Sequence, residues 1–344
     1  MRVLHVVRSD GFAGVERYVS RLAVQQADSG DEVVVVGGDQ RRMGIAVRTA
    51  SGSLRQRRGD SLAQVVTALD RLAPGADVVH AHMTAAELGA AVVRFPWRRR
   101  TPVITSRHFA SRRGTGRAGQ AAGRVAGWVV DAQIAVSRFV AENVEGPSTV
   151  VYPGVDRQPD AAPATTRDRT ILVVQRLEVE KDTALAVRAF AVSELAARGW
   201  RLQLAGEGAR RGDLEQLAGE LGVAHATEFL GSRDDVAVLM GRAALLLASA
   251  PAEPLGLSVV EAMSSGLPVV ASASGGHLET LPSDAGMFAP GDVAAAATQL
   301  VGLARDPQQR DALARAGQDR QRSTFTLEAQ VAGTRAVYLD QLSR

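Results

Sequence analysis

The chain has 344 residues, with 40 basic and 37 acidic residues, 46% hydrophobic residues and no cysteine. The lack of cysteine excludes disulfides, thiolate metal sites and a cysteine nucleophile, and the six histidines show no zinc-type spacing with acidic partners. The length predicts two domains of about 150 residues, each with enough apolar residues for a core. All basic residues but one are arginines, a bias typical of GC-rich coding, so the single lysine, Lys181, stands out.

Charge is spread unevenly along the chain. Residues 1–170 carry 24 arginines against 16 acidic residues, a net charge of +8, whereas residues 171–344 carry −5. A basic first half favours an anionic partner, such as a phosphate or a lipid surface, and an ordinary solvated arginine surface is an equal alternative. No nucleic-acid-binding module is visible, so we expect no nucleic acid partner.

Apolar runs are short throughout the sequence. No run approaches the 18 residues of a membrane-spanning helix, and the first run, residues 3–7, is too short for a signal peptide. We therefore expect a cytoplasmic protein, with peripheral contact at the inner face of the membrane as a further expectation.

Strand and helix patterns alternate over residues 1–155. Runs rich in Val and Ile predict strands over residues 3–7, 32–36, 77–80, 102–105, 132–136 and 149–152. Helical periodicity predicts helices over residues 15–27, 61–72, 85–95 and 137–143, the last with Ser137 as its N-cap. Such alternation predicts a parallel sheet with helices on both faces.

A stretch rich in Pro, Asp, Ala and Thr, residues 156–169, is typical of a linker. Beyond it, strands are predicted over residues 171–174, 201–205, 227–230, 243–247 and 268–271. Helices are predicted over residues 183–196, 211–221, 234–240, 257–264, 293–304, 307–322 and 327–342.

The fold class is therefore expected to be α/β, with two tandem doubly wound Rossmann-like domains, residues 1–155 and 170–325. A final helical segment, residues 326–344, is expected to pack back toward the first domain. Ligands bind at the carboxyl edges of such sheets, so we expect the ligand in an interdomain cleft.

The strongest site signal is the segment 252–263, in which Glu253 and Glu261 stand eight positions apart. Backbone N–H groups at Gly256–Ser258 would open the following helix and form an anion site. Glu261, about one turn inside, could accept paired hydrogen bonds from a ribose diol, and Glu253 could reach sugar hydroxyls. The alternative is a surface glutamate plus a glutamate favoured by the helix dipole.

A second signal follows the predicted strand 171–174. Arg176 and Lys181 lie five positions apart on a loop that leads into a helix. Two cations placed in this way can straddle a diphosphate and stabilise the charge that develops as a nucleotide leaves. A solvated loop is the alternative.

Glycines and histidines mark further strand ends. Gly14, after the first strand, would allow close backbone approach to phosphate or sugar oxygens. His80, His82 and His108 end two predicted strands of the first domain, where a neutral imidazole could accept from a sugar hydroxyl. A strand-end histidine without a role is the alternative, and His5, inside a strand, is expected to pack in the core.

Residues 107–124 combine five arginines with Gly114, Gly116 and Gly119, a composition that we interpret as a mobile loop. We hypothesise that it contacts an anionic acceptor or anionic lipid. The segment 97–100, Trp-Arg-Arg-Arg, could add a contact with a membrane surface.

These motifs resemble those of a known enzyme family. The segment from Glu253 through Glu-Ala-Met-Ser-Ser-Gly-Leu-Pro-Val-Val-Ala, and then Gly275-Gly276 with Glu279, is similar to the signature of GT-B glycosyltransferases of the large retaining family 4, the group 1 type. That family has Gly-Arg-Leu and Lys-Gly in the cationic loop; here Arg176 and Lys181 match, with Gln175 and Asp182 in place of the two glycines. The resemblance extends from about residue 3 to 342.

The resemblance implies a hexosyltransferase that retains anomeric configuration and needs no metal or other cofactor. The donor would be a nucleotide sugar of the UDP or GDP type, UDP being favoured as the commonest bacterial donor nucleotide, and the departing phosphate would help to deprotonate the acceptor. The acceptor would be a hydroxyl of a small molecule, a glycan or a lipid-linked molecule. A sugar-nucleotide epimerase and a non-catalytic nucleotide-sugar-binding protein are the alternatives.

The resemblance also implies site residues. Catalytic roles fall to His108, Arg176, Lys181 and Glu253. Donor contacts fall to Gly14, Gly206, Gly231, Pro254, Leu255, Gly256, Leu257, Ser258 and Glu261. We place Glu16, His82, Arg107 and Arg112 on the acceptor side.

Overall fold

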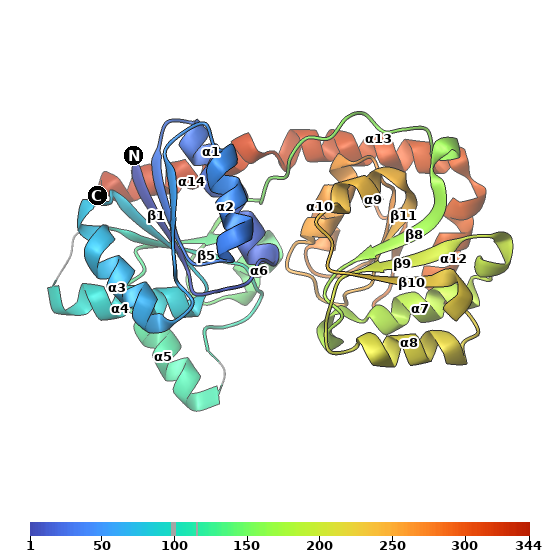
Figure 1. Cartoon of the computed structure of the whole chain (residues 1–344), viewed down its shortest axis with the longest axis horizontal. Coiled ribbons are helices and arrows are strands. Elements are labelled where there is room, and N and C mark those ends of the chain that lie inside the picture. The colour runs from blue at the N-terminus through green and yellow to red at the C-terminus, as the bar shows by residue number, and fades with distance from the viewer. Residues whose placement is uncertain (98–100, 115) are drawn as a thin grey trace. The chain divides into compact units, whose positions relative to one another are not determined.

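The computed structural model describes residues 1–97, 101–114 and 116–344, and it divides into two compact units (Figure 1). The first comprises Met1–Gly154 together with Leu327–Arg344, and the second comprises Val155–Thr326. Residues 156–169, expected as a linker, belong to the second unit. There the backbone N–H of Ala161 donates to Gln318 at 3.1 Å, and that of Ala164 donates to Asp311 at 2.8 Å.

The first unit has a parallel seven-stranded sheet in the order β3-β2-β1-β4-β5-β6-β7. The strands are β1 (Arg2–Val7), β2 (Glu32–Val36), β3 (Leu54–Arg57), β4 (Val78–His82), β5 (Val103–Arg107), β6 (Ala132–Ala135) and β7 (Thr149–Val150). The helices are α1 (Gly14–Asp28), α2 (Gln40–Thr49), α3 (Leu62–Leu72), α4 (Thr84–Trp97), α5 (Gly116–Trp128), α6 (Arg138–Asn143) and α14 (Leu327–Leu342).

Two apolar layers enclose this sheet. Helices α1, α2, α6 and α14 form a core with one face, and α3 and α4 form a core with the other (Figure 1). The last helix, α14, lies against α1 and contributes the fully buried Tyr338. The C-terminal segment is therefore part of the first unit.

Three elements of this unit escaped the sequence prediction. Helix α2 buries only Met43, and β3 reads Leu-Arg-Gln-Arg with only Leu54 buried, so neither contains a run of apolar residues that marks a core element. Helix α5 corrects the expectation of a mobile glycine loop. Its Gly123 packs so closely on the preceding loop that an added Cβ would lie 2.6 Å from the carbonyl oxygen of Arg113, so glycine here permits helix packing.

The second unit has a parallel six-stranded sheet in the order β10-β9-β8-β11-β12-β13. The strands are β8 (Asp168–Val174), β9 (Arg201–Ala205), β10 (Thr227–Gly231), β11 (Ala243–Ala248), β12 (Val269–Ser272) and β13 (Met287–Phe288). The helices are α7 (Thr183–Val192), α8 (Arg211–Glu220), α9 (Val236–Arg242), α10 (Leu257–Ser264), α11 (His277–Thr280), α12 (Val293–Arg305) and α13 (Pro307–Thr324).

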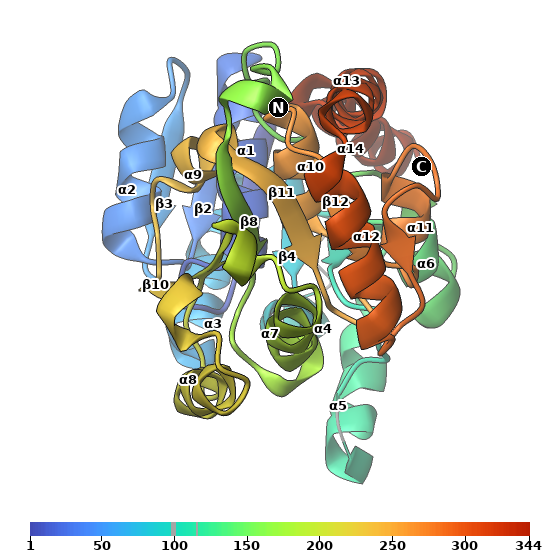
Figure 2. The same cartoon turned by 90° about the vertical axis from the view of Figure 1, so that its right-hand side faces the viewer.

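Helices cover both faces of this second sheet as well. Helices α7, α8 and α12 share a large apolar core with β8, β9 and β11, and α10 packs against α13 on the other face (Figure 2). Both sheets are thus doubly wound.

Each sheet contains one point where the direction of strand addition reverses. In the first sheet this point lies between β1 and β4, and in the second it lies between β8 and β11. The loops that leave two such strands diverge to opposite faces and create a ligand-binding crevice. Ligand-binding residues are therefore expected on the loops that follow β1, β4, β8 and β11.

Candidate functional site

The reversal point of the second sheet brings two predicted catalytic residues together. Lys181 lies on the loop after β8 and Glu253 on the loop after β11, and Lys181 Nζ lies 2.5 Å from Glu253 Oε2. Their side chains are 18% and 19% exposed. Arg176, on the same loop as Lys181, is 54% exposed and forms an ion pair with Glu180 at 2.6 Å. The two predicted cations and the carboxylate thus lie at one edge of the sheet. An anion that binds to the Lys181 ammonium would replace the Glu253 carboxylate as its partner.

The loop that carries Lys181 is braced where the family has glycines. Gln175 Nε2 donates to the carbonyl oxygen of Lys181 at 3.0 Å, and Thr183 Oγ1 and Ser249 Oγ also lie within 3.0 Å of it. Asp182 adopts the left-handed conformation, φ 45° and ψ 49°, in which glycine is usually found, and its carboxylate caps α7 by accepting from Leu185 N–H. Both replacements therefore stiffen the loop. Sequence reasoning did not find the role of Gln175 or of Ser249.

Gly256 and α10 form the other side of this edge. Gly256 has φ 92°, and an added Cβ would lie 2.9 Å from the ring of the buried His277, so only glycine fits. Helix α10 begins at Leu257, so the N–H groups of Leu257 and Ser258 belong to its first turn and have no acceptor within the helix. Glu261 lies half-buried in the second turn.

The loop after β12, which contains Gly275 and Gly276, and the following helix α11 hydrogen-bond to segment 253–255. Gly276 N–H donates to the carbonyl oxygen of Glu253 at 2.7 Å, and Thr280 Oγ1 donates to that of Leu255 at 2.8 Å. Leu255 is 3% exposed, and Pro254 is half-buried. Leu255 could therefore contact a nucleotide-sugar donor only through its backbone. Thr280 was not singled out from the sequence, because its contact depends on the return of the chain after β12.

Gly206 and Gly231 shape the neighbouring loops. Gly206 has φ 155°, and an added Cβ would lie 1.9 Å from the carbonyl oxygen of Gln175. Its N–H donates to the carbonyl oxygen of Gly231, which has φ 68°, at 2.8 Å. These glycines allow the loops after β8, β9 and β10 to pack together, and their contact with the donor stays a prediction.

In the first unit, the predicted histidines lie in one hydrogen-bonded cluster. His82 Nδ1 lies 3.2 Å from His108 Nε2, and His82 Nε2 lies 3.0 Å from His5 Nδ1. His5, His80 and His82 are completely buried, whereas His108 is partly exposed. The prediction that His5 is a core residue is confirmed. Since both ring nitrogens of His82 have protein partners, its expected contact with the acceptor would pass through His108.

Burial keeps these imidazoles neutral. Desolvation lowers the pKa of His5 to about 4, against a weaker opposing effect of its bond to Gln26. Desolvation, with the charge of Arg107 as a second cause, lowers the pKa of His108 to about 3. For His80 and His82, burial and then the neighbouring rings hold the pKa well below its ordinary value. A neutral imidazole offers one N–H and one lone pair.

Three histidines of the cluster are also a candidate metal group. One nitrogen from each of His5, His80 and His82 falls within 4.8 Å of the others. However, each of the six ring nitrogens has a protein partner. All three histidines thus have protein hydrogen-bond partners at both ring nitrogens. That the activity needs no metal stays a prediction.

The other residues expected on the acceptor side have structural partners, with one exception. Glu16 is 6% exposed and accepts from Ala13 N–H at 2.9 Å in the capping box of α1, which begins at the exposed Gly14. Arg107 is 7% exposed, donates to the carbonyl oxygen of Ser111 at 2.6 Å and lies 3.3 Å from Glu145. Arg112 is exposed. Contact with an acceptor stays a prediction for these residues.

Of the basic segment near residue 100, Arg98, Arg99 and Arg100 lie outside the described residues. Among the residues that are described, no helix is long and apolar enough to cross a membrane.

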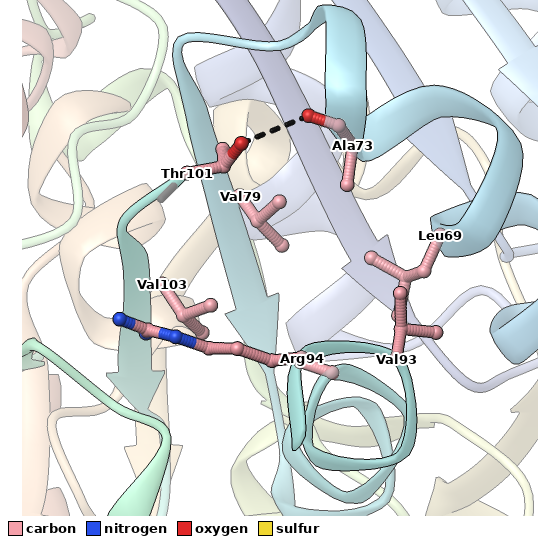
Figure 3. Close-up of a pocket in the computed structure, with 8 residues that line it drawn as sticks. Leu69, Ala73, Val79, Val93, Arg94, Thr101 and Val103 are labelled. Atoms are coloured by element: carbon pink, nitrogen blue, oxygen red, sulfur yellow. Dashed lines mark hydrogen bonds between the residues drawn. The ribbon is translucent and has the colours of Figure 1, made fainter. Parts of the chain in front are cut away.

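A small apolar recess lies in the first unit, between β4, β5 and the helices α3 and α4 (Figure 3). Its lining residues are Leu69, Ala73, Val79, Ala90, Val93, Arg94, Thr101 and Val103. Thr101 Oγ1 donates to the carbonyl oxygen of Ala73 at 3.0 Å, so the rest of the lining is apolar apart from Arg94. The recess belongs to the core and contains none of the predicted site residues.

Comparisons with known proteins identify related sequences and a shared fold. The family model "Glycosyl transferases group 1" matches residues 155–320, and the model "Glycosyltransferase Family 4" matches residues 12–158. Glycogen synthase of Mycobacterium tuberculosis is 34% identical over 201 residues, which cover 56% of this chain and 48% of that protein. A GDP-mannose-dependent alpha-(1-6)-phosphatidylinositol dimannoside mannosyltransferase of the same species is 36% identical over 114 residues, 33% of this chain and 30% of that protein.

The chain spans about half the length of the first of these curated relatives. Among solved structures, Anabaena Alr3699/HepE in complex with UDP and glucose superimposes with a TM-score of 0.81 at 19% identity, over 99% of this chain and 100% of that one. This similarity establishes the two-domain fold. With two family models matching consecutive halves and the same fold throughout, the chain belongs to the GT-B glycosyltransferases of the group 1 type.

Proposed function

We propose that the protein transfers a hexosyl residue from a nucleoside diphosphate sugar, with UDP as the favoured nucleotide, to an acceptor hydroxyl with retention of configuration. The observation that carries this proposal is the pairing of Lys181 with Glu253 beside the first turn of α10. A cation, a carboxylate and unbonded backbone N–H groups at one sheet edge are the chemistry that a charged diphosphate and a polyhydroxylated sugar require.

Each site residue then has a defined task. Lys181 and Arg176 neutralise the departing diphosphate, together with the N–H groups of Leu257 and Ser258. Glu261 accepts from the ribose hydroxyls. Glu253, released from Lys181 when the diphosphate binds, accepts from hydroxyls of the transferred sugar.

In the proposed reaction, the bond between the anomeric carbon and the phosphate oxygen breaks as the acceptor oxygen bonds to the same face of the sugar. The acceptor proton passes to the departing phosphate. His108 orients a sugar hydroxyl. No divalent metal is required in this scheme, so EDTA should leave the rate unchanged, and loss of activity restored by added metal would contradict it.

Two other functions are distinguishable. A sugar-nucleotide epimerase would need an acid and a base flanking a sugar carbon, and it would form product without any acceptor. A non-catalytic binding protein would bind the nucleotide sugar without turnover. The cations Arg176 and Lys181 on the loop after β8, with Lys181 paired to Glu253 just before α10, favour transfer over both, because they are suited to stabilising a leaving group.

A thermal-shift screen over UDP, GDP, ADP and TDP and their sugars tests the donor class. A ligand that binds only the native state raises Tm by mass action. We expect a UDP sugar to give the largest shift and to support transfer. A larger shift with GDP would assign GDP in place of UDP as the donor nucleotide, and no shift with any nucleotide would contradict the proposal.

We propose that the acceptor is lipid-linked or lies at an anionic membrane surface, because α5 exposes both apolar and basic side chains. Trp128 is 80% exposed and Val125 45% exposed, and Arg117 and Arg124 are exposed on the same helix. Such a combination favours interfacial binding to anionic lipid. Co-sedimentation should be stronger with vesicles containing anionic lipid than with neutral vesicles, and it should weaken in the Trp128→Ala variant; equal sedimentation with both kinds of vesicle would contradict the contact.

A further inference from the structure

Three imidazoles lie on one face of the first sheet, under helices α1 and α14. His5 on β1 stands beside His80 on β4 in the sheet register, and His82 lies two residues further along the same face. All three rings are completely buried. A polar group in such a position is costly unless it is fully hydrogen-bonded, so the partners of these rings determine their state.

The partners form a chain that starts at a side-chain amide. Gln26 Oε1, on α1, lies 2.6 Å from His5 Nε2. His5 Nδ1 lies 3.0 Å from His82 Nε2, and His82 Nδ1 lies 3.2 Å from His108 Nε2. An amide oxygen can only accept, so the His5 proton resides on Nε2 and its Nδ1 accepts from His82. By the same rule, His82 accepts at Nδ1 from His108 Nε2–H.

A second branch follows the same direction. Gln26 Nε2 donates to the Tyr338 hydroxyl at 3.4 Å, and that hydroxyl lies 2.6 Å from His80 Nδ1. If Tyr338 donates to Nδ1, the His80 proton resides on Nε2, which lies 2.8 Å from Ser106 Oγ. The orientation of one amide, that of Gln26, thus sets both branches.

The chain of hydrogen bonds ends at His108, the one histidine of the cluster that is not fully buried. His108 packs edge-on against Tyr18, with ring centroids 4.7 Å apart and planes at 82°. Within residues 1–97, 101–114 and 116–344, the described hydrogen bonds engage its Nε2 and leave its Nδ1 without a protein partner. The direction of these hydrogen bonds therefore leaves His108 Nδ1 unprotonated, so that it can accept a hydrogen bond.

We infer that Gln26, His5 and His82 are positioning residues that fix the tautomer of His108, so that His108 Nδ1 accepts a hydrogen bond from a sugar hydroxyl during transfer. The inference rests on the proposed function for the identity of that hydroxyl, and on the hydrogen-bond chain alone for the tautomer. A hydroxyl that donates to Nδ1 is held in one orientation, whereas the other tautomer would present an N–H and turn the hydroxyl around.

Imidazole nitrogen shifts of the full chain labelled with ¹⁵N-histidine test the tautomer without any substitution. We expect the proton on Nε2 and an unprotonated Nδ1 for His108, with the same tautomer for His5 and His82. A proton on His108 Nδ1 in the wild type would overturn the inference, because it would mean that the Gln26 amide is reversed.

Gln26→Met tests the anchor, with Gln25→Met, its partly buried neighbour on α1, as the matched control. Losing one directing hydrogen bond should leave His108 as a mixture of tautomers and lower kcat roughly tenfold, with KM for the nucleotide sugar nearly unchanged. Gln25→Met should keep both the single tautomer and the rate. A single Nε2–H tautomer with full activity in Gln26→Met would contradict the inference.

The two hypotheses fail separately. Absence of transfer with every nucleotide sugar would refute the proposed function, whereas the nitrogen shifts would still report whether the chain fixes His108.

Discussion

Replacing Lys181 with Met separates the role of its charge in catalysis from its role in folding. Met keeps the aliphatic stem and removes the ammonium that pairs with Glu253 at 2.5 Å. Both side chains are about one-fifth exposed, and pairs near the surface contribute roughly 0.2–1 kcal/mol to the free energy of unfolding. A loss of that size lowers Tm by at most about 4 °C in a protein of this size.

The expected effect on transfer is larger. A hydrogen bond from a charged donor is worth about 1.5–3 kcal/mol, and a group that acts mainly on the departing diphosphate applies this energy to the transition state. Lys181→Met should therefore lower kcat/KM by a factor of about 10 to 150. The contrast between a small loss of stability and a large loss of rate identifies a catalytic charge.

The assay is the initial rate of nucleoside diphosphate release with the donor found by thermal shift, together with Tm of each variant. Arg315→Met, an exposed position on α13, is the control for removal of one positive charge from the same unit. If Lys181→Met retains kcat/KM within threefold of the wild type at unchanged Tm, the role assigned to the only lysine is wrong.

Three further predictions concern Glu253, Gln175 and His5. Glu253→Gln removes the carboxylate that competes for Lys181, so calorimetry should show UDP bound at least as tightly while transfer falls about tenfold or more; weaker UDP binding would contradict the exchange. Gln175→Gly restores the family residue but removes three contacts of its amide, so the free energy of unfolding should fall by about 1–3 kcal/mol in urea titration. Acid should destabilise the fold, because the pKa of His5 is about 4 in the folded protein and about 6.5 in the unfolded chain. As the pH falls from 8 to 5, the unfolded chain therefore binds a proton at His5 that the folded protein does not. At pH 5 this difference alone should lower the free energy of unfolding by about 2 kcal/mol relative to pH 8. Equal stability at the two pH values would contradict the buried neutral state.

The sequence predicts the elements that bury apolar side chains and misses those that do not. Strand β9 and helix α14 have the predicted bounds. Strand β9 alternates Leu202 and Leu204 with polar residues, and α14 buries Val331, Val337 and Tyr338. Helix α2 and strand β3 were missed because each buries a single apolar side chain, Met43 and Leu54. Helix α5 was interpreted as a loop because its glycines permit close packing as well as mobility.

The candidate site shows the same division between local and distant information. Arg176, Lys181 and Glu253 were found from local spacing and family resemblance, since each lies on a loop after a predicted strand. Their pairing was not found, because a contact across 72 positions depends on the order of strands in the sheet. The bond between Gln26 and Tyr338 spans 312 positions, and neither residue carries a motif.

The anomeric configuration of the product shows whether the protein transfers a sugar from a nucleoside diphosphate donor with retention. Proton NMR can follow the anomeric signals of an α-linked donor, such as UDP-glucose, and of the product during turnover by the wild-type protein. For retaining transfer we expect consumption of the donor, release of the nucleoside diphosphate and an α-linked product. A β-linked product, or epimerised donor formed without an acceptor, would contradict it.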